Sequence, residues 1–295
     1  MAIAAMALAL ASQTTQPNEA PAGFDDKSNG LVDDATHQAD QEKFDEIEEV
    51  ADGLGPLYNA QSCRECHQNP TSGGASQVSE LRVGHVGPDG RFINPDIPIA
   101  RGTEIIKGRT LVNDRAICPS AAFPDTEIQE RVPAGETVRT ARLTTNLLGD
   151  GFVEAVTDKS LVDLAHEQCA ASHGKICGLA IRVPIVEAPG QSGVGRFGWK
   201  DQHASLLSFS GDAYLNEMGI TSPLFPDEVT KLCNTAAEPN DKPGPDGLPM
   251  STTSRVSSGP RKHPRAMRNW RRHRRLSEGR TCSTRSVAPS VTCES

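Results

Sequence analysis

The sequence has few aromatic residues, no long apolar run and only one cysteine pair of the Cys-x-x-Cys type. Of its 295 residues, 4% are aromatic and 36% are apolar, whereas 26 are glycine and 21 are proline. This composition indicates many turns and a small side-chain core. A membrane-spanning helix needs about 20 consecutive apolar residues. No stretch of this length is apolar, so the sequence predicts no transmembrane anchor.

The single close pair consists of Cys63 and Cys66, and His67 follows directly. A structural zinc site needs a second pair of ligands, and the absence of a second Cys-x-x-Cys disfavours zinc. Cys-x-x-Cys-His is the attachment signature of a c-type haem. Two thiols three positions apart can each form a thioether with one vinyl group of the same porphyrin. The adjacent imidazole then lies under the ring, where it can bind the iron.

We therefore predict one covalently bound haem c, with Cys63 and Cys66 as the attachment residues and His67 as the proximal iron ligand. A buried porphyrin would also replace part of the core that the composition lacks. The alternative is a chance Cys-x-x-Cys whose two cysteines form a disulfide with each other.

The sixth iron ligand is left open by the sequence. Met218 ends an expected helix, and His85 and His203 are further candidates. Each has a simpler interpretation, because methionine is usually a core side chain and a histidine beside a turn usually faces solvent. Trp199 could pack on the porphyrin or lie on an electron path, and Arg196 is a second candidate in the same block. The glycines of that block could equally make it structural.

The first 40 residues divide into an apolar and a polar part. Residues 1–11 contain a short Ala- and Leu-rich run, which resembles the apolar region and cleavage site of a secretory signal peptide without its basic start. Residues 12–40 are polar and acidic and are predicted to form a flexible lead. Because bacteria attach haem c outside the cytoplasm, we expect a periplasmic or secreted protein.

Hydrophobic periodicity predicts three helices. Apolar residues at three- and four-residue steps between residues 44 and 54 predict an amphipathic helix just before the haem motif. A second helix is expected to begin near residue 158, with Asp158 or Ser160 as its N-cap. A third is expected from about residue 200 to 218, unless Gly211 breaks it.

Between these helices the sequence predicts strands and loops. Residues 81–118 contain β-like segments around a Pro-Asp-Gly turn at 88–90. Residues 238–249 are rich in proline, glycine and aspartate and are predicted to be a linker. We therefore expect one haem domain over residues 41–237, with short strands inserted into it, followed by this linker.

Four further cysteines lie between the haem motif and the linker, namely Cys118, Cys169, Cys177 and Cys233. In an exported protein an even number suggests disulfides, and four cysteines allow three pairings. Cys169 with Cys177 is the easiest closure because the two are close in sequence. A redox-active dithiol is the alternative, and it would need an accessible cysteine with a low pKa.

Four blocks of sequence together resemble one family. They are residues 53–60 (Gly-Leu-Gly-Pro-Leu-Tyr-Asn-Ala), 147–156, 195–200 (Gly-Arg-Phe-Gly-Trp-Lys) and 216–222. These blocks look like the di-haem oxidoreductases, also labelled thiol oxidoreductases, which are similar to bacterial di-haem cytochrome c peroxidases. The resemblance spans roughly residues 40–249. It implies a mainly α, cytochrome-c-like haem domain with loop-rich and short-β insertions (α+β), and a family pattern of two such domains with one haem each.

The charge changes abruptly near residue 250. Residues 251–295 carry a formal charge of +9, whereas the preceding residues carry −17. The resemblance implies two haem motifs, and only one is present. A frameshift near residue 250 would explain both observations, because the codons of residues 287–292 permit Cys-x-x-Cys-His in the shifted frame. Residues 250–295 are then an out-of-frame tail, expected to be disordered. The alternative is a basic arm for nucleic acid or membrane, which the arginine-rich run at 271–275 would suit.

The leading functional hypothesis is an exported c-type haem protein that transfers electrons, a truncated relative of the di-haem oxidoreductases. Its expected partner is a small redox protein or another electron donor or acceptor, and no nucleic acid. Peroxidase-like catalysis is left open, because the sequence as written lacks the second haem motif. The alternatives are a secreted, disulfide-stapled binding module without haem and a thiol-based oxidoreductase.

Overall fold

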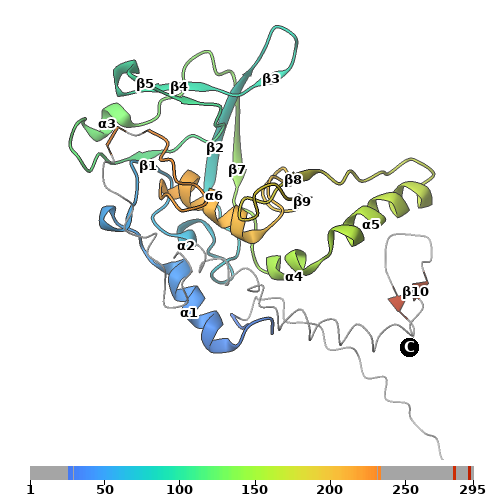
Figure 1. Ribbon diagram of the computed structural model, residues 1–295. Coiled ribbons are helices and arrows are strands. Elements are labelled where there is room, and N and C mark those ends of the chain that lie inside the picture. The colour runs from blue at the N-terminus through green and yellow to red at the C-terminus, as the bar shows by residue number, and fades with distance from the viewer. Residues whose placement is uncertain (1–25, 29, 231, 234–281, 284–291, 294–295) are drawn as a thin grey trace, which may run out of the picture.

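The computed structural model describes residues 26–28, 30–230, 232–233, 282–283 and 292–293. In these residues the chain forms six α-helices and five small antiparallel sheets (Figure 1). The helices are α1 (Asp34–Asp45), α2 (Cys63–Cys66), α3 (Asp125–Ile128), α4 (Asp150–Ala155), α5 (Asp158–Ala171) and α6 (Leu206–Met218). The strands are β1 (Leu57–Tyr58), β2 (Ser79–Val86), β3 (Phe92–Ile93), β4 (Asp96–Ile99), β5 (Glu104–Lys107), β6 (Arg115–Ala116), β7 (Val138–Leu143), β8 (Arg182–Pro184), β9 (Ser192–Val194), β10 (Cys282–Ser283) and β11 (Thr292–Cys293).

The longest strands, β2 and β7, pair antiparallel over six residue pairs. Figure 1 shows these two strands side by side, with β3, β4 and β5 at one end and α2 and α6 toward the other. Successive side chains of a strand point to opposite faces of the sheet. Glu80 and Arg82 on β2 therefore share one face with Arg142 and Thr140, which lie opposite them on β7. The charged side chains on this face line the candidate functional site.

The expected mainly α, cytochrome-c-like fold is wrong. Strands predominate between residues 79 and 143, where α3 is the only α-helix. The physical reason is composition, because this region is rich in Val, Ile and Thr, which favour extended backbone. The main partner of β2 is β7, far along the chain, and local periodicity cannot reveal such a pairing. The described chain is a mixed structure of six α-helices and several small sheets.

The first helix lies earlier than predicted. α1 begins after Asp33, whose carboxylate accepts a hydrogen bond from the Thr36 N–H at 2.8 Å. This N-cap places a helix inside the segment that composition predicts to be a flexible lead. Between residues 44 and 54, where periodicity predicts a helix, the backbone completes only the end of α1 and one 3-10 turn. Gly53 ends that turn in a left-handed conformation, with φ 96°.

The other two predicted helices are present with different starting points. α5 is capped by Thr157, which accepts a hydrogen bond from the Ser160 N–H at 3.2 Å, so neither predicted N-cap is used. α6 begins at Leu206, later than predicted. Gly211 does not break α6. A Cβ at Gly211 would lie 2.8 Å from the ring of Phe225, so glycine permits a close contact here.

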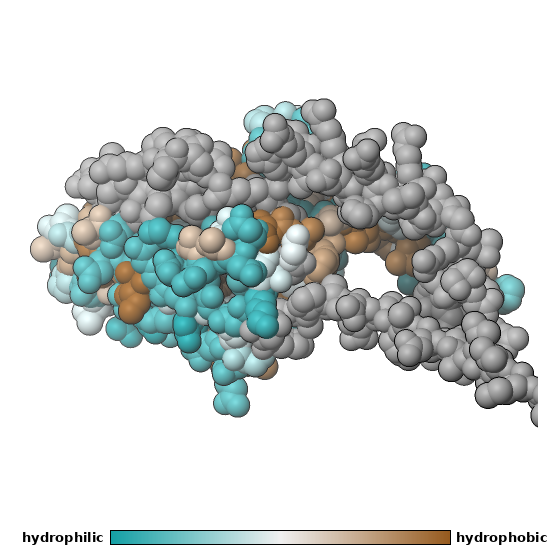
Figure 2. All heavy atoms as spheres, turned by 90° about the horizontal axis from the view of Figure 1, so that it is seen from below, coloured by the Kyte–Doolittle hydropathy of each residue, from teal (hydrophilic) through white to brown (hydrophobic). Residues whose placement is uncertain are grey.

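Three small hydrophobic clusters stabilise the described fold. They contain Leu57, Val83, Ile97, Ile99, Ile106 and Val112; Leu54, Tyr214, Met218 and Ile220; and Ala100, Cys118, Ile128 and Cys233. Burial of one large aliphatic side chain contributes about 1.5–3 kcal/mol to folding. Figure 2 shows one face of the molecule, where hydrophilic side chains predominate and hydrophobic ones form small patches. Such a surface agrees with the low apolar content of the sequence.

Two disulfides crosslink the described chain. Cys169 pairs with Cys177, which confirms the pairing predicted from their spacing. Cys118 pairs with Cys233 across 115 positions of sequence. The Cys118–Cys233 disulfide connects the segment that follows α6 to the segment that precedes α3, and both of its cysteines are buried.

Several predicted segments lie outside the described residues. They are residues 1–11, about half of the acidic lead, the linker at 238–249 and most of the tail from residue 250. Within that tail, the structure describes only β10 and β11, which pair antiparallel. The disorder of the tail stays a prediction. Among the residues that the structure describes, no helix combines the length and the hydropathy that a membrane crossing requires.

Candidate functional site

The Cys-x-x-Cys-His motif forms a single helical turn, α2. Ser62 caps the turn by accepting a hydrogen bond from the Glu65 N–H at 3.3 Å, and the His67 N–H donates to the Cys63 carbonyl oxygen at 3.0 Å. Residues three and four positions apart lie on one side of a helix. Cys66 and His67 are therefore on the same side as Cys63. The motif presents two thiols and one imidazole together.

The segment after the motif is held against the end of β7. The Thr144 hydroxyl donates a hydrogen bond to the Cys66 carbonyl oxygen at 2.9 Å. The chain turns back so tightly at Gly74 that a Cβ there would lie 1.9 Å from the Asn69 carbonyl oxygen, a contact that excludes any side chain. These contacts attach α2 to the sheet that β2 and β7 form.

Both thiols and His67 line a cavity of about 720 Å³. This volume lies within the range of sites that hold small molecules and cofactors. The sheet contributes the face of β2 and β7 described above, and α6 contributes residues 209–218 together with the preceding loop at 198–203. Three parts of the chain that are distant in sequence therefore meet at one site.

The two free thiols differ from catalytic thiols. Loss of hydration raises the pKa of Cys63 to about 12, and the charge of Glu48 adds to the shift. Loss of hydration also raises the pKa of Cys66 to about 12, with the charge of Glu217 as the second cause. The other cysteines whose side chains the structure describes are in disulfides. A thiol-based oxidoreductase needs an accessible thiol of low pKa, and none is present among them.

A raised thiol pKa predicts slow alkylation. In protein produced without haem attachment, we expect Cys63 and Cys66 to react with iodoacetamide at pH 8 on the order of a thousandfold more slowly than an ordinary cysteine, because only the thiolate is nucleophilic. Peptide mass mapping of the Cys63–Cys66 peptide measures the rate, and the same protein in urea is the control. Rapid labelling of the folded protein at pH 7 would contradict the prediction and favour a thiol-based function.

His67 is held in the form that binds metals. Loss of hydration lowers the pKa of its imidazole, although backbone groups of Gly74 and Thr145 oppose the shift. Its Nδ1 atom is buried and has no hydrogen-bond partner among the described residues. The ring of Phe44 packs edge-on against it, with 6.1 Å between ring centroids. Neutral imidazole is the form of histidine that coordinates metal ions.

Two of the three candidates for a sixth iron ligand lie at the cavity. Met218 and His203 line it, and Met218 is also a core residue with only 3% of its surface exposed. The Nε2 atom of His203 lies 3.4 Å from the Asp212 carboxylate. His85 does not line the cavity, and its Nδ1 atom lies 2.9 Å from Glu136. The structure therefore separates His85 from the site.

Arg196 and Trp199 have different environments. Arg196 forms an ion pair with Asp158 at 2.5 Å and donates to the Val156 carbonyl oxygen at 2.6 Å, so it joins α4 to α5 and does not line the cavity. The indole of Trp199 does line the cavity, and 54% of its surface is exposed. The Arg142 guanidinium lies 5.7 Å from the centroid of the Trp199 ring. The structural interpretation thus applies to Arg196, whereas Trp199 is available to a ligand in the cavity.

One group of cavity charges has no counterpart among the predicted site residues. Arg82 lies 2.5 Å from Glu80 and 3.8 Å from Glu217, and Asn59 donates a hydrogen bond to Glu217 at 3.0 Å. Loss of hydration, followed by the charge of Glu80, raises the pKa of Glu217 to about 8. The two-residue spacing of Glu80 and Arg82 on a strand is a signal that both share one face. Nothing in the sequence shows that α6 meets that face.

Residues 121–236 match the sequence model of one family, described as di-haem oxidoreductase, putative peroxidase. Over these residues, the chain is similar to the di-haem oxidoreductase family. The match covers about two fifths of the chain and contains the blocks at 147–156, 195–200 and 216–222. The haem motif lies outside the matched residues. No curated protein and no solved structure matches the chain significantly.

The family match supports a haem-related oxidoreductase role for the chain. The matched region also contributes α6, β7 and Trp199 to the cavity that the motif lines. The haem motif lies outside the matched residues in sequence. In the structure, the motif and the matched region nevertheless line the same cavity.

The cavity residues fit a haem. Cys63 and Cys66 are not bonded to each other, and His67 has a buried nitrogen without a partner among the described residues. Five cationic side chains line the cavity against three carboxylates, an excess that suits the two anionic propionates of a haem. They are Arg82, Lys107, Arg109, Arg142 and Lys200, against Glu80, Asp212 and Glu217.

Proposed function

We propose that this protein is an exported c-type haem protein that transfers electrons. In the proposal, Cys63 and Cys66 bind one haem covalently, and His67 is its proximal iron ligand. The supporting observation is the single turn of α2, which presents two unpaired thiols and one imidazole to the same cavity of about 720 Å³. A motif whose cysteines merely formed a disulfide would not need such a cavity.

The state of these side chains suits their proposed roles. Each thioether forms when a thiol S–H adds across a vinyl C=C bond, so nothing is released. The raised pKa values keep both thiols protonated until that addition occurs. The lowered pKa of His67 keeps its imidazole neutral, and the packing of Phe44 against the ring fixes its orientation.

A bound haem would supply one-electron chemistry at its iron. The chain decides how that chemistry is used through the group that faces the iron from the other side. A methionine sulfur in that position favours a higher potential and electron transfer, whereas an open position favours reaction with peroxide. Met218 lies at the cavity and is the proposed candidate for such a ligand, with His203 as the alternative.

Covalent haem is the test of the proposal. We expect protein matured in a bacterial periplasm with the haem c attachment machinery to keep one haem per chain after acid–acetone extraction, which removes haem that is not covalently bound. A pyridine haemochrome spectrum quantifies the haem. Protein that folds and forms its disulfides but contains no covalent haem would contradict the proposal and leave the disulfide-stapled binding module.

A second measurement separates an electron carrier from a peroxidase, the activity named in the family description. Hydrogen peroxide and a reduced electron donor are added to haem-loaded protein. If the chain is an electron carrier only, oxidation of the donor stays close to the rate without protein. Donor oxidation at enzyme-like turnover would show that this chain is itself a peroxidase.

A further inference from the structure

The charges at the cavity differ in sign from those of the whole chain. The formal net charge of the protein is −8, yet five cationic side chains and only three carboxylates line the cavity. An acidic protein repels anions from most of its surface. A local excess of cationic side chains at the cavity therefore favours the approach of anionic groups to it.

The cationic side chains fall into two groups. Arg82 and Arg109 pair with buried or half-buried carboxylates inside the fold, Arg82 with Glu80 and Arg109 with Glu130. By contrast, Lys107, Arg142 and Lys200 have no carboxylate within 4 Å among the described residues. Lys107 and Lys200 are exposed, and Arg142 is half-buried. Asp201 follows Lys200 in sequence but does not line the cavity.

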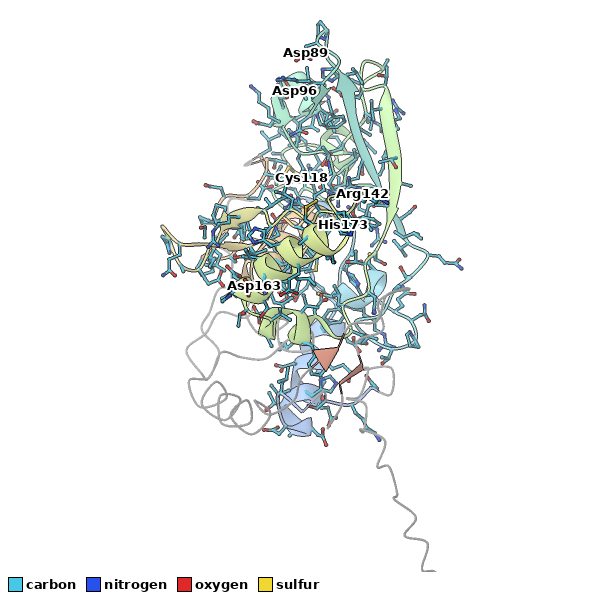
Figure 3. All side chains as sticks on the ribbon, turned by 90° about the vertical axis from the view of Figure 1, so that its right-hand side faces the viewer. Asp89, Asp96, Cys118, Arg142, Asp163 and His173 are labelled. Atoms are coloured by element: carbon cyan, nitrogen blue, oxygen red, sulfur yellow. A yellow bond between two sulfur atoms is a disulfide. The ribbon has the colours of Figure 1, made fainter. Side chains whose placement is uncertain are left out.

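An exposed aromatic ring accompanies the unpaired cations. Trp199 lines the cavity, and 54% of its surface is exposed. The contact between Arg142 and the Trp199 ring joins the end of β7 to the loop before α6. Figure 3 shows Arg142 beside β7. Arg142, Trp199 and Lys200 thus form one surface, which we call the Trp199 patch.

We propose that the Trp199 patch docks the acidic face of a small electron-transfer protein, and this inference rests on the proposed haem function. An apolar centre surrounded by charges of one sign is a common composition for a protein interface. The exposed indole would exclude water where the two proteins meet. Arg142 and Lys200 would attract an acidic partner and orient it toward the cavity.

Two blue-copper proteins of different charge test the proposal. The reduced, haem-loaded protein is mixed with oxidised plastocyanin, which is acidic, or with oxidised azurin, which is nearly neutral. One electron passes from the haem iron to the copper, which changes from Cu(II) to Cu(I). Stopped-flow absorbance of the copper band gives the second-order rate constant at several salt concentrations. We expect the rate with plastocyanin to fall as salt is added, and the rate with azurin to change little.

Charge reversal at the patch gives the decisive comparison. We expect the double variant Arg142→Glu with Lys200→Glu to lower the ratio of the plastocyanin rate to the azurin rate about tenfold at low salt. This ratio cancels any change at the haem that affects both partners alike. Lys159→Glu is the matched control. Lys159 is exposed on α5 and does not line the cavity, so its reversal should have little effect on either rate.

The outcomes are distinguishable from failure of the haem proposal. Haem content and reduction potential are measured first for every protein, and absence of covalent haem ends the proposed function before any kinetics. If haem is present and the plastocyanin rate rises with salt, the overall negative charge governs the approach and the docking inference is wrong. If the double variant changes the haem content or the potential but leaves the plastocyanin rate unchanged, the cations serve the haem propionates alone.

Discussion

Replacing Cys63 and Cys66 together by alanine is expected to abolish covalent haem attachment. Both thiols line the cavity and neither is bonded to another cysteine, so the double variant removes the only unpaired sulfhydryls whose side chains the structure describes. The haem retained after acid–acetone extraction should fall from about one per chain to none. Each single variant should retain haem through one thioether, with a pyridine haemochrome band between those of doubly attached and free haem.

The Cys169–Cys177 disulfide provides a matched control. Cys169→Ala with Cys177→Ala also removes two cysteines, but this pair lies at the end of α5 and does not line the cavity. Covalent haem should persist in that variant. Loss of haem from both double variants would show that misfolding, and not the missing thioethers, explains the result.

His67 is tested in the same series. Replacement by glycine leaves both thiols in place and opens space beside Phe44 for a small ligand. We expect covalent haem with an altered spectrum, and partial recovery of the original spectrum when imidazole is added. A spectrum unchanged in His67→Gly would show that another group binds the iron on this side.

The site was more predictable from sequence than the fold. The spacing of Cys63, Cys66 and His67 predicts a set of groups on one helical side, and α2 is one helical turn. Such a motif depends only on neighbouring residues. Its proposed role in haem attachment stays a prediction, because the family match does not include it.

The architecture depends on contacts that sequence does not show. β2 pairs with β7 far along the chain, and this pairing turns a region predicted to be an insertion into the centre of the fold. The position of α1 likewise follows from one hydrogen bond to Asp33, not from apolar periodicity. Periodicity reports which face of an element is apolar, but it does not report which element will cover that face.

The remaining cavity residues could not be assigned for the same reason. Arg142 is one of many arginines in the sequence, and it becomes notable only because the structure places it against Trp199. Glu217 stands next to a predicted candidate, Met218, but its raised pKa depends on Glu80, which lies on another element. Conversely, His85 is a candidate that the structure removes, because it does not line the cavity and its Nδ1 atom lies 2.9 Å from Glu136.

Removing the Cys118–Cys233 disulfide is expected to have the largest effect on stability. A crosslink restricts the unfolded chain more strongly when it closes a longer loop. With 115 positions between the two cysteines, the loop-entropy relation predicts a loss of about 5 kcal/mol when both are replaced by alanine. Both side chains are buried, so the lost packing with Ile128 and Ala100 adds to this loss. Urea unfolding of the variant measures the change in the free energy of unfolding.

The shorter crosslink again serves as the comparison. Cys169 and Cys177 are 8 positions apart, and the same relation predicts a loss of only about 2.5 kcal/mol for their double alanine variant. The described segment after α6 contacts the body through Val229, Leu232 and Cys233. Without the long crosslink, this segment has less to hold it beside the sheets, and α6, which lines the cavity, precedes it directly. Equal losses in the two variants would contradict the loop-length explanation. A changed haem absorption spectrum together with the larger loss of stability would show that the Cys118–Cys233 bond maintains the α6 side of the cavity.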